Sequence, residues 1–120
     1  MPYVDGFIVP VPKKNLDAYA RMSKKAGKVW REYGALDYRE WVADDAPVGK
    51  VTSFPRSVKL KPGEVVVFAW ITYKSRALRD RINAKVMADP RLKDMMGPNG
   101  SPPFDGKRMI FGGFNSLVKV

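Results

Sequence analysis

The stretch EVVVFAWITYKSRALRDR, residues 64–81, decides the fold. Its first ten residues are mostly β-branched or aromatic, which is typical of a strand, and their alternation places Phe68 and Trp70 side by side on one face. Ser75 then follows as a good helix N-cap. The apolar residues beyond it recur four apart, as on one face of a helix: Leu78, Ile82 and Val86. We therefore expect a strand over 65–73, with two large rings on the sheet, leading directly into a helix.

The same kinds of pattern on either side of this stretch predict a complete α+β fold. They indicate a strand over 3–11, a helix from an N-cap at Asn15 to Gly34, a strand over 35–43, a short strand over 57–60, a turn at 61–64, a loop over 95–106 and a last strand over 107–120 with a bulge at Gly112 and Gly113. The order β-α-β-β-α-β is that of the ferredoxin-like fold, an antiparallel sheet with two helices on one face. The length fits one domain, so we assign residues 1–120 to a single domain.

The two faces of this sheet are expected to differ, because right-handed crossovers put both helices on the same side. We assign the smaller side chains to the helix side: Val4, Gly6 and Ile8 on the first strand and Val67, Ala69 and Ile71 on the third. The open face then carries Tyr3, Asp5, Phe7, Val66, Phe68, Trp70 and Thr72, joined by Tyr38 and Glu40 if the second strand keeps register. Such an aromatic patch normally marks a binding surface. We expect it to meet a second copy in a homodimer, with a cavity where the two sheets do not close completely.

The composition excludes several kinds of site. The chain has no cysteine and no histidine, which rules out disulfides, thiolate nucleophiles, Ser-His-Asp triads and histidine metal sites. Proton transfer would have to use Asp, Glu, Tyr, Lys or a terminal amine. We expect no cofactor. The N-terminus lacks the features of a secretion signal, and no apolar run approaches the roughly 18 residues of a membrane helix, so we expect a cytoplasmic protein.

The net charge of +10, from 22 Lys and Arg against 12 Asp and Glu, favours RNA or another polyanion as an alternative partner. Four basic residues lie near the end of the first predicted helix, where the helix dipole also favours cations on a solvated face: Lys24, Lys25, Lys28 and Arg31. FAWITY, residues 68–73, matches the later positions of the aromatic pattern with which RRM domains stack bases. Val66 and Val67, however, stand where that pattern has a basic residue and Gly.

Several blocks of the chain resemble one known family. They are YVDGFIVPVPKKNLDAYARM (3–22), GKVWREYGALDYREWVADD (27–45), GKVTSFPR (49–56), VVVFAWITYKSRALRDRINAKVMADPR (65–91) and PFDGKRMIFGGF (103–114). They look like the YbaA-like family of uncharacterised bacterial proteins, in the dimeric α/β-barrel superfamily. The resemblance implies a ferredoxin-like protomer and a homodimer joined through its sheets.

The resemblance implies no reaction. The wider superfamily includes cofactor-free monooxygenases, haem-degrading enzymes and stress-response barrels, so the fold alone does not carry a chemistry. Where family members often read W-R-E-H-G-A-L, this chain has Tyr33. A mechanism that needs that histidine therefore cannot operate here.

Asp5 and Glu40 are the candidate catalytic residues, because a carboxyl group buried among aromatic rings has a raised pKa and suits proton transfer. The alternative is that they form ion pairs with basic residues such as Arg108 or Lys74. The expected ligand-binding residues are Phe7, Tyr38, Phe68, Trp70 and Arg108.

Three functions compete for this predicted fold. The first hypothesis is that the cavity binds a small hydrophobic or aromatic metabolite, with or without chemistry like that of cofactor-free monooxygenases or isomerases. RNA binding by the basic helix or the aromatic face is the second. A structural or stress-related dimer without a ligand is the third.

Overall fold

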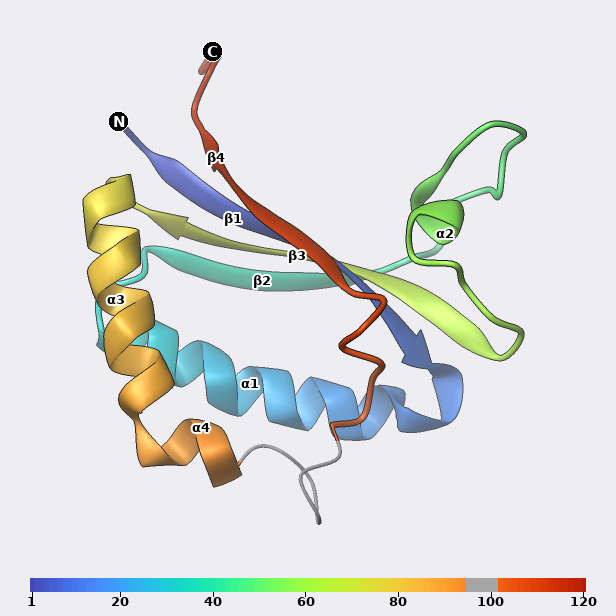
Figure 1. The fold of residues 1–120 in the computed structure, drawn as a ribbon, viewed down its shortest axis with the longest axis horizontal. Coiled ribbons are helices and arrows are strands. Elements are labelled where there is room, and N and C mark those ends of the chain that lie inside the picture. The colour runs from blue at the N-terminus through green and yellow to red at the C-terminus, as the bar shows by residue number, and fades with distance from the viewer. Residues whose placement is uncertain (95–101) are drawn as a thin grey trace.

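The computed structural model describes residues 1–94 and 102–120, which form one antiparallel sheet with its two longest helices packed on one side (Figure 1). In chain order the elements are β1 (Tyr3–Pro12), the 3-10 helix η1 (Lys13–Asn15), α1 (Leu16–Glu32), β2 (Asp37–Val42), α2 (Phe54–Ser57), β3 (Glu64–Tyr73), α3 (Arg76–Ala88), α4 (Pro90–Asp94) and β4 (Ile110–Asn115). The strands lie in the order β2-β3-β1-β4, and every neighbouring pair is antiparallel. This confirms the predicted ferredoxin-like fold.

Local sequence signals account for the element boundaries. The Ser75 hydroxyl accepts a hydrogen bond from the Leu78 N–H at 3.2 Å, so it caps α3 as predicted. The predicted turn before β3 is also present, since the Glu64 N–H donates to the Lys61 carbonyl at 3.1 Å. Asn15 precedes α1 but makes no capping hydrogen bond with its side chain.

The predicted short strand over 57–60 is wrong. The segment just before it forms α2, because the Ser53 hydroxyl accepts from the Arg56 N–H at 3.1 Å and caps a helical turn. Pro55 stands at the start of this turn, where its missing N–H costs no hydrogen bond. The Ser-x-Pro pattern is thus a helix start rather than the loop before a strand. None of the helices in the described ranges has the length and apolar content of a membrane-spanning segment.

The last strand is shorter than predicted and has no bulge. β4 ends at Asn115, and its glycines stay in unbroken register, with Gly112 opposite Gly6 and Gly113 opposite Asp5. A small residue facing a small residue lets the two backbones pair without distortion, so no extra residue has to be accommodated. The predicted loop over 95–106 falls partly outside the described residues.

The core lies between the sheet and the helices. It is formed by buried side chains of β1, α1, β3 and α3, together with Ala35: Tyr3, Val9, Val11, Tyr19, Val29, Ala35, Val67, Ile71, Tyr73, Ile82 and Val86. Val67 and Ile71 pack here, which confirms the predicted helix side of β3. α1 and α3 both contribute to the core, so both cover the same face of the sheet.

On β1 the predicted faces are wrong. Asp5 pairs directly with Ile71, and Phe7 pairs with Ala69, and residues directly opposite each other share a face. The odd-numbered side chains of β1 therefore point to the helices, and Val4, Gly6 and Ile8 belong to the open face. The physical reason is that the odd set also contains Val9 and Val11 near the end of β1, and both are buried in the core.

On β2 the predicted faces are wrong in the same way. Tyr38 pairs with Ile71 and Glu40 with Ala69, so both side chains point toward the helix layer. The cavity predicted between two open sheet faces therefore cannot hold these residues. They lie instead between the sheet and the helices of a single chain.

Candidate functional site

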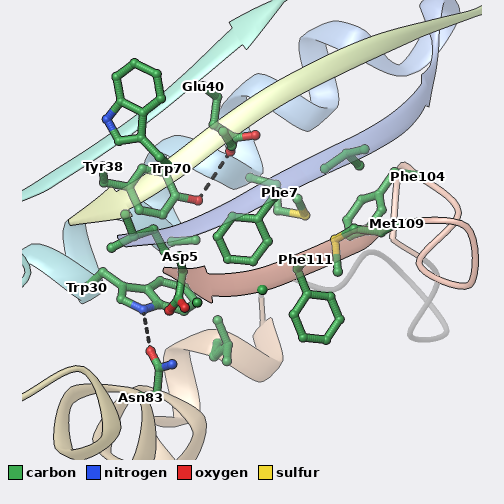
Figure 2. Close-up of a pocket in the computed structure, with 18 of the residues that line it drawn as sticks. Asp5, Phe7, Trp30, Tyr38, Glu40, Trp70, Asn83, Phe104, Met109 and Phe111 are labelled. Carbon is green, nitrogen blue, oxygen red and sulfur yellow. Dashed lines mark hydrogen bonds between the residues drawn. The ribbon is translucent and has the colours of Figure 1, made fainter. Parts of the chain in front are cut away.

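A cavity of about 500 Å³ lies between the sheet and the helices (Figure 2). Its wall is mostly apolar, and aromatic side chains from β1, α1, β2, the segment before β4 and β4 itself contribute to it: Phe7, Tyr19, Trp30, Tyr38, Phe104 and Phe111. This volume is within the range of small-molecule sites, roughly 300–1,000 Å³. The cavity is therefore large enough for a ligand, and polar groups in its wall can orient that ligand.

Glu40 supplies a carboxyl group that three hydroxyl groups hold in place. Its Oε1 atom accepts a hydrogen bond from Tyr19, and its Oε2 atom accepts from Ser23 and from Tyr38. Figure 2 shows the hydrogen bond from Tyr38. Burial raises the pKa of Glu40, while the hydrogen bonds from the two tyrosines act in the opposite direction. Burial and the neighbouring carboxylate also raise the pKa of both phenols, so these remain protonated donors at neutral pH.

Helix α1 positions two of these donors by its own periodicity. Tyr19 and Ser23 are four residues apart and thus lie on one face, next to β2. One turn further on, a Cβ atom at Gly27 would lie 2.7 Å from Cδ1 of Tyr38. The absence of a side chain at Gly27 therefore lets the Tyr38 ring lie against the helix, with its hydroxyl directed to Glu40.

A second polar group in the wall is an ion pair between β1 and α3. Nε of Arg79 lies 3.2 Å from Oδ1 of Asp5, and Nη2 of Arg79 donates to the Tyr3 hydroxyl at 3.0 Å. These groups pack over Gly113, where a Cβ atom would be 2.2 Å from the Tyr3 oxygen. Burial raises the pKa of Asp5, and the positive charge of Arg79 opposes this effect. Asp5 thus has a basic partner, but it is Arg79 rather than the predicted Arg108 or Lys74.

Asn83 fixes the far wall of the cavity. Its Oδ1 atom accepts hydrogen bonds from Trp30 Nε1 at 3.0 Å, shown in Figure 2, and from the Tyr73 hydroxyl at 3.3 Å. These bonds join α1, β3 and α3. The sequence analysis did not predict Asn83, Tyr19 or Ser23 as site residues. For Tyr19 and Ser23 a signal was present, because they are four residues apart on the face of α1 that also carries Trp30.

The open face of the sheet carries a separate aromatic cluster. The ring of Trp70 lies 5.4 Å from that of Trp41, and the ring of Phe68 lies between Trp70 at 5.6 Å and Phe54 at 6.0 Å. Phe68 remains 40% exposed. The indole N–H of Trp70 donates to Asp37 at 3.1 Å, which fixes the orientation of its ring on this face.

The structure divides the predicted ligand-binding residues between these two places. Phe7 and Tyr38 contribute to the wall of the cavity, as do the candidate catalytic residues Asp5 and Glu40. Trp70 borders the cavity too, but its ring belongs to the cluster on the open face. The predicted ligand-binding residues Phe68 and Arg108 do not line it.

Arg108 has a structural position instead. It forms ion pairs with Glu64 at 2.6 Å and with Asp105 at 2.8 Å, and it donates to the Lys59 carbonyl at 3.0 Å. It therefore ties the segment before β4 to the start of β3. The basic residues predicted for nucleic acid lie exposed on α1: Lys24, Lys25, Lys28 and Arg31.

The described ranges contain no cluster of three or more His, Cys, Asp or Glu side chains that could hold a metal ion. The polar groups of the cavity are instead carboxyl, hydroxyl, amide and guanidinium groups. These can bind a ligand by hydrogen bonds and can accept or donate protons.

Comparison with known proteins identifies the family. Residues 2–106 match the model of the family described as "Protein of unknown function (DUF1428)". The chain is also 51% identical over 118 residues to "Uncharacterized protein YbaA" of Escherichia coli strain K12, a match that covers 98% of each chain. The chain belongs to the DUF1428 family. This confirms the predicted resemblance to YbaA-like proteins.

Two solved structures resemble this DUF1428 protein in fold. One is Rv0793 from Mycobacterium tuberculosis, with a TM-score of 0.59, 13% identity, and coverage of 99% of this chain and 98% of that chain. The other is a dimeric ferredoxin-like protein from an uncultured marine organism, with a TM-score of 0.50, 14% identity, and coverage of 100% and 98%. At these identities the likeness concerns the fold alone. Within this DUF1428 chain, Tyr33 lies outside the cavity wall and donates to Asp89 at 2.8 Å.

Proposed function

We propose that the protein binds a small, mainly apolar ring compound in the cavity between the sheet and the helices. The observation that carries this proposal is an aromatic-lined space of about 500 Å³ with a fixed carboxyl group, Glu40, in its wall. Convergent polar groups in an otherwise apolar cavity are the usual composition of a ligand site. Chemistry of the cofactor-free monooxygenase or isomerase kind would need Glu40 or Asp5 as the proton acceptor.

A screen of small aromatic compounds by thermal shift and native mass spectrometry tests this proposal. Ala26 lies buried on α1 in the cavity wall, so Ala26→Leu fills part of the space. The matched control is Ala20→Leu, at an exposed position of the same helix. A bound compound should lose its affinity in the first variant and keep it in the second. Equal binding to both variants would place the ligand elsewhere.

The proposal includes a homodimer formed through the open faces of two sheets. Large apolar side chains on this face and on the adjoining loop are exposed: Trp41 at 46%, Phe54 at 50%, Ile110 at 44% and Phe114 at 60%. The C-terminal residues beyond β4 add Leu117 and Val118, which are at least 75% exposed. Exposed apolar surface of this extent is typical of an interface. The dimeric ferredoxin-like structural neighbour supports the same assembly.

A second candidate function is loose, non-specific association with nucleic acid through α1. The exposed basic residues of this helix favour it, and binding of this kind weakens steeply with salt. The double variant Lys24→Glu, Lys25→Glu should then abolish retention on an RNA column at low salt, whereas Phe68→Ala should leave it unchanged. The opposite result would favour base stacking on the open face.

A further inference from the structure

We propose that Glu40 selects ligands that present a hydrogen-bond donor, such as a hydroxyl or N–H group attached to a ring, and that it excludes ring compounds with a carboxylate at the same position. This inference rests on the proposed binding function of the cavity and names the chemical class of its ligand.

The Glu40 carboxylate has an acceptor position that no hydrogen bond uses. An ionised carboxylate offers about four acceptor positions and no donor. Ser23 and Tyr38 both donate to Oε2, and Tyr19 donates to Oε1. One acceptor position therefore remains, on Oε1. Because Glu40 belongs to the cavity wall, a ligand in the cavity can supply the missing donor.

The charges around the cavity disfavour a ligand with a carboxylate near Glu40. Glu40 has no ion pair among the described residues. The guanidinium group in the wall, Arg79, already lies 3.2 Å from Asp5 and 3.0 Å from Asp80. A carboxylate on the ligand would thus approach Glu40 without a free cation to compensate it, whereas a neutral or cationic donor meets a favourable partner.

Hydrogen bonds also hold the Glu40 carboxyl group in a fixed position. The donors to Glu40 come from two elements, α1 and β2, so the carboxyl group cannot turn away from the cavity without breaking hydrogen bonds. Phe7 and Trp30 lie in the same cavity wall as Tyr38, where they can hold the apolar part of the ligand (Figure 2). Orientation of the ring by these side chains would bring its polar substituent to Oε1.

Three compounds that share the naphthalene ring test the inference: 2-naphthol, its methyl ether and 2-naphthoate, with affinities measured by calorimetry at pH 8. The ether keeps the ring and the oxygen but has no donor. A hydrogen bond to a buried carboxylate should make 2-naphthol bind about 10- to 100-fold more tightly than the ether. We expect 2-naphthoate to bind more weakly than the ether.

Two variants separate Glu40 from its surroundings. Glu40→Gln removes the charge and should reduce the preference for 2-naphthol and the exclusion of 2-naphthoate together. Tyr19→Phe keeps the ring in the wall but frees a second acceptor position on Oε1, so it should keep or increase the preference. Thermal unfolding of each variant checks that it is folded.

The outcomes distinguish the inference from the proposed function. Equal binding of naphthol and ether to the natural protein, or the same preference in Glu40→Gln, would overturn the inference and leave a ring-binding cavity. Binding of none of the three compounds would overturn both.

Discussion

At the scale of single residues, the buried carboxyl group of Glu40 should make the stability of the protein depend on pH. Its pKa in the folded chain is raised above the ordinary value of 4.5, chiefly by burial. The folded chain therefore holds the proton to higher pH than the unfolded chain does. The stability that Glu40 contributes is complete below about pH 4.5 and is lost as the pH rises through the folded pKa.

The variant Glu40→Gln isolates this effect, because Gln does not titrate. We expect the free energy of unfolding of the natural protein, minus that of the variant, to fall as the pH rises above 4.5 and then to level off. Urea unfolding between pH 4 and pH 8 measures this difference. The pKa of Asp5 is raised as well and that of Glu64 is lowered, so both contribute to the pH dependence that remains in the variant. A difference that grows with pH would mean that the hydroxyl hydrogen bonds outweigh burial.

At the scale of elements, the contact between α1 and β2 depends on Gly27. Ala is the better helix former by about 1 kcal/mol, so helix propensity alone would favour Gly27→Ala. The added methyl group would, however, lie 2.7 Å from the Tyr38 ring, and overpacking of this kind costs about 1–3 kcal/mol. We therefore expect Gly27→Ala to destabilise the protein, as measured by urea unfolding.

A double-mutant cycle identifies the ring as the cause. In a Tyr38→Val background the methyl group meets no ring, so the same Gly27→Ala change should become neutral or stabilising. Destabilisation of the same size in both backgrounds would contradict the proposed contact.

The sequence alone predicts some features of the elements but not others. The order of strands and helices, the cap at Ser75 and the helix side of β3 follow from local patterns, because each depends on residues close together in the chain. The faces of β1 and β2 do not. Alternation defines two sets of side chains on a strand, but the choice between them depends on pairing with β3, whose partner of Asp5, Ile71, lies far away in the sequence.

Dependence on distant residues also explains which parts of the candidate site the sequence predicts. Asp5 and Glu40 were recognised as carboxyl groups among aromatic residues, and both lie in the cavity wall. Their partners could not be recognised, because Arg79 and the hydroxyl groups of Tyr19 and Ser23 reach them across the packed layers. The sequence does not indicate the structural position of Arg108, because its ion pair with Glu64 joins residues that are far apart in the chain.

At the scale of the whole molecule, charge and apolar surface are separated. The exposed basic residues of α1 belong to the helix layer, whereas the aromatic cluster of Trp41, Phe68 and Trp70 belongs to the opposite face of the sheet. A chain with a net charge of +10 repels its copies, so self-association needs a surface that keeps the basic helices apart. Contact between two open faces meets this condition, because it places the helix layers on the outside.

This arrangement predicts that one added charge on the open face breaks the proposed dimer. Phe68 lies on β3 at the centre of the aromatic cluster and is 40% exposed, so Phe68→Glu can be accommodated in a single chain but would bury two carboxylates in the dimer. Light scattering at micromolar concentration should give the mass of two 13.5 kDa chains for the natural protein and of one for the variant. Ala20→Glu adds the same charge to an exposed position of α1 and should leave the dimer intact. If the natural protein has the mass of one chain, the open face needs a different partner, since its exposed rings would then remain in water.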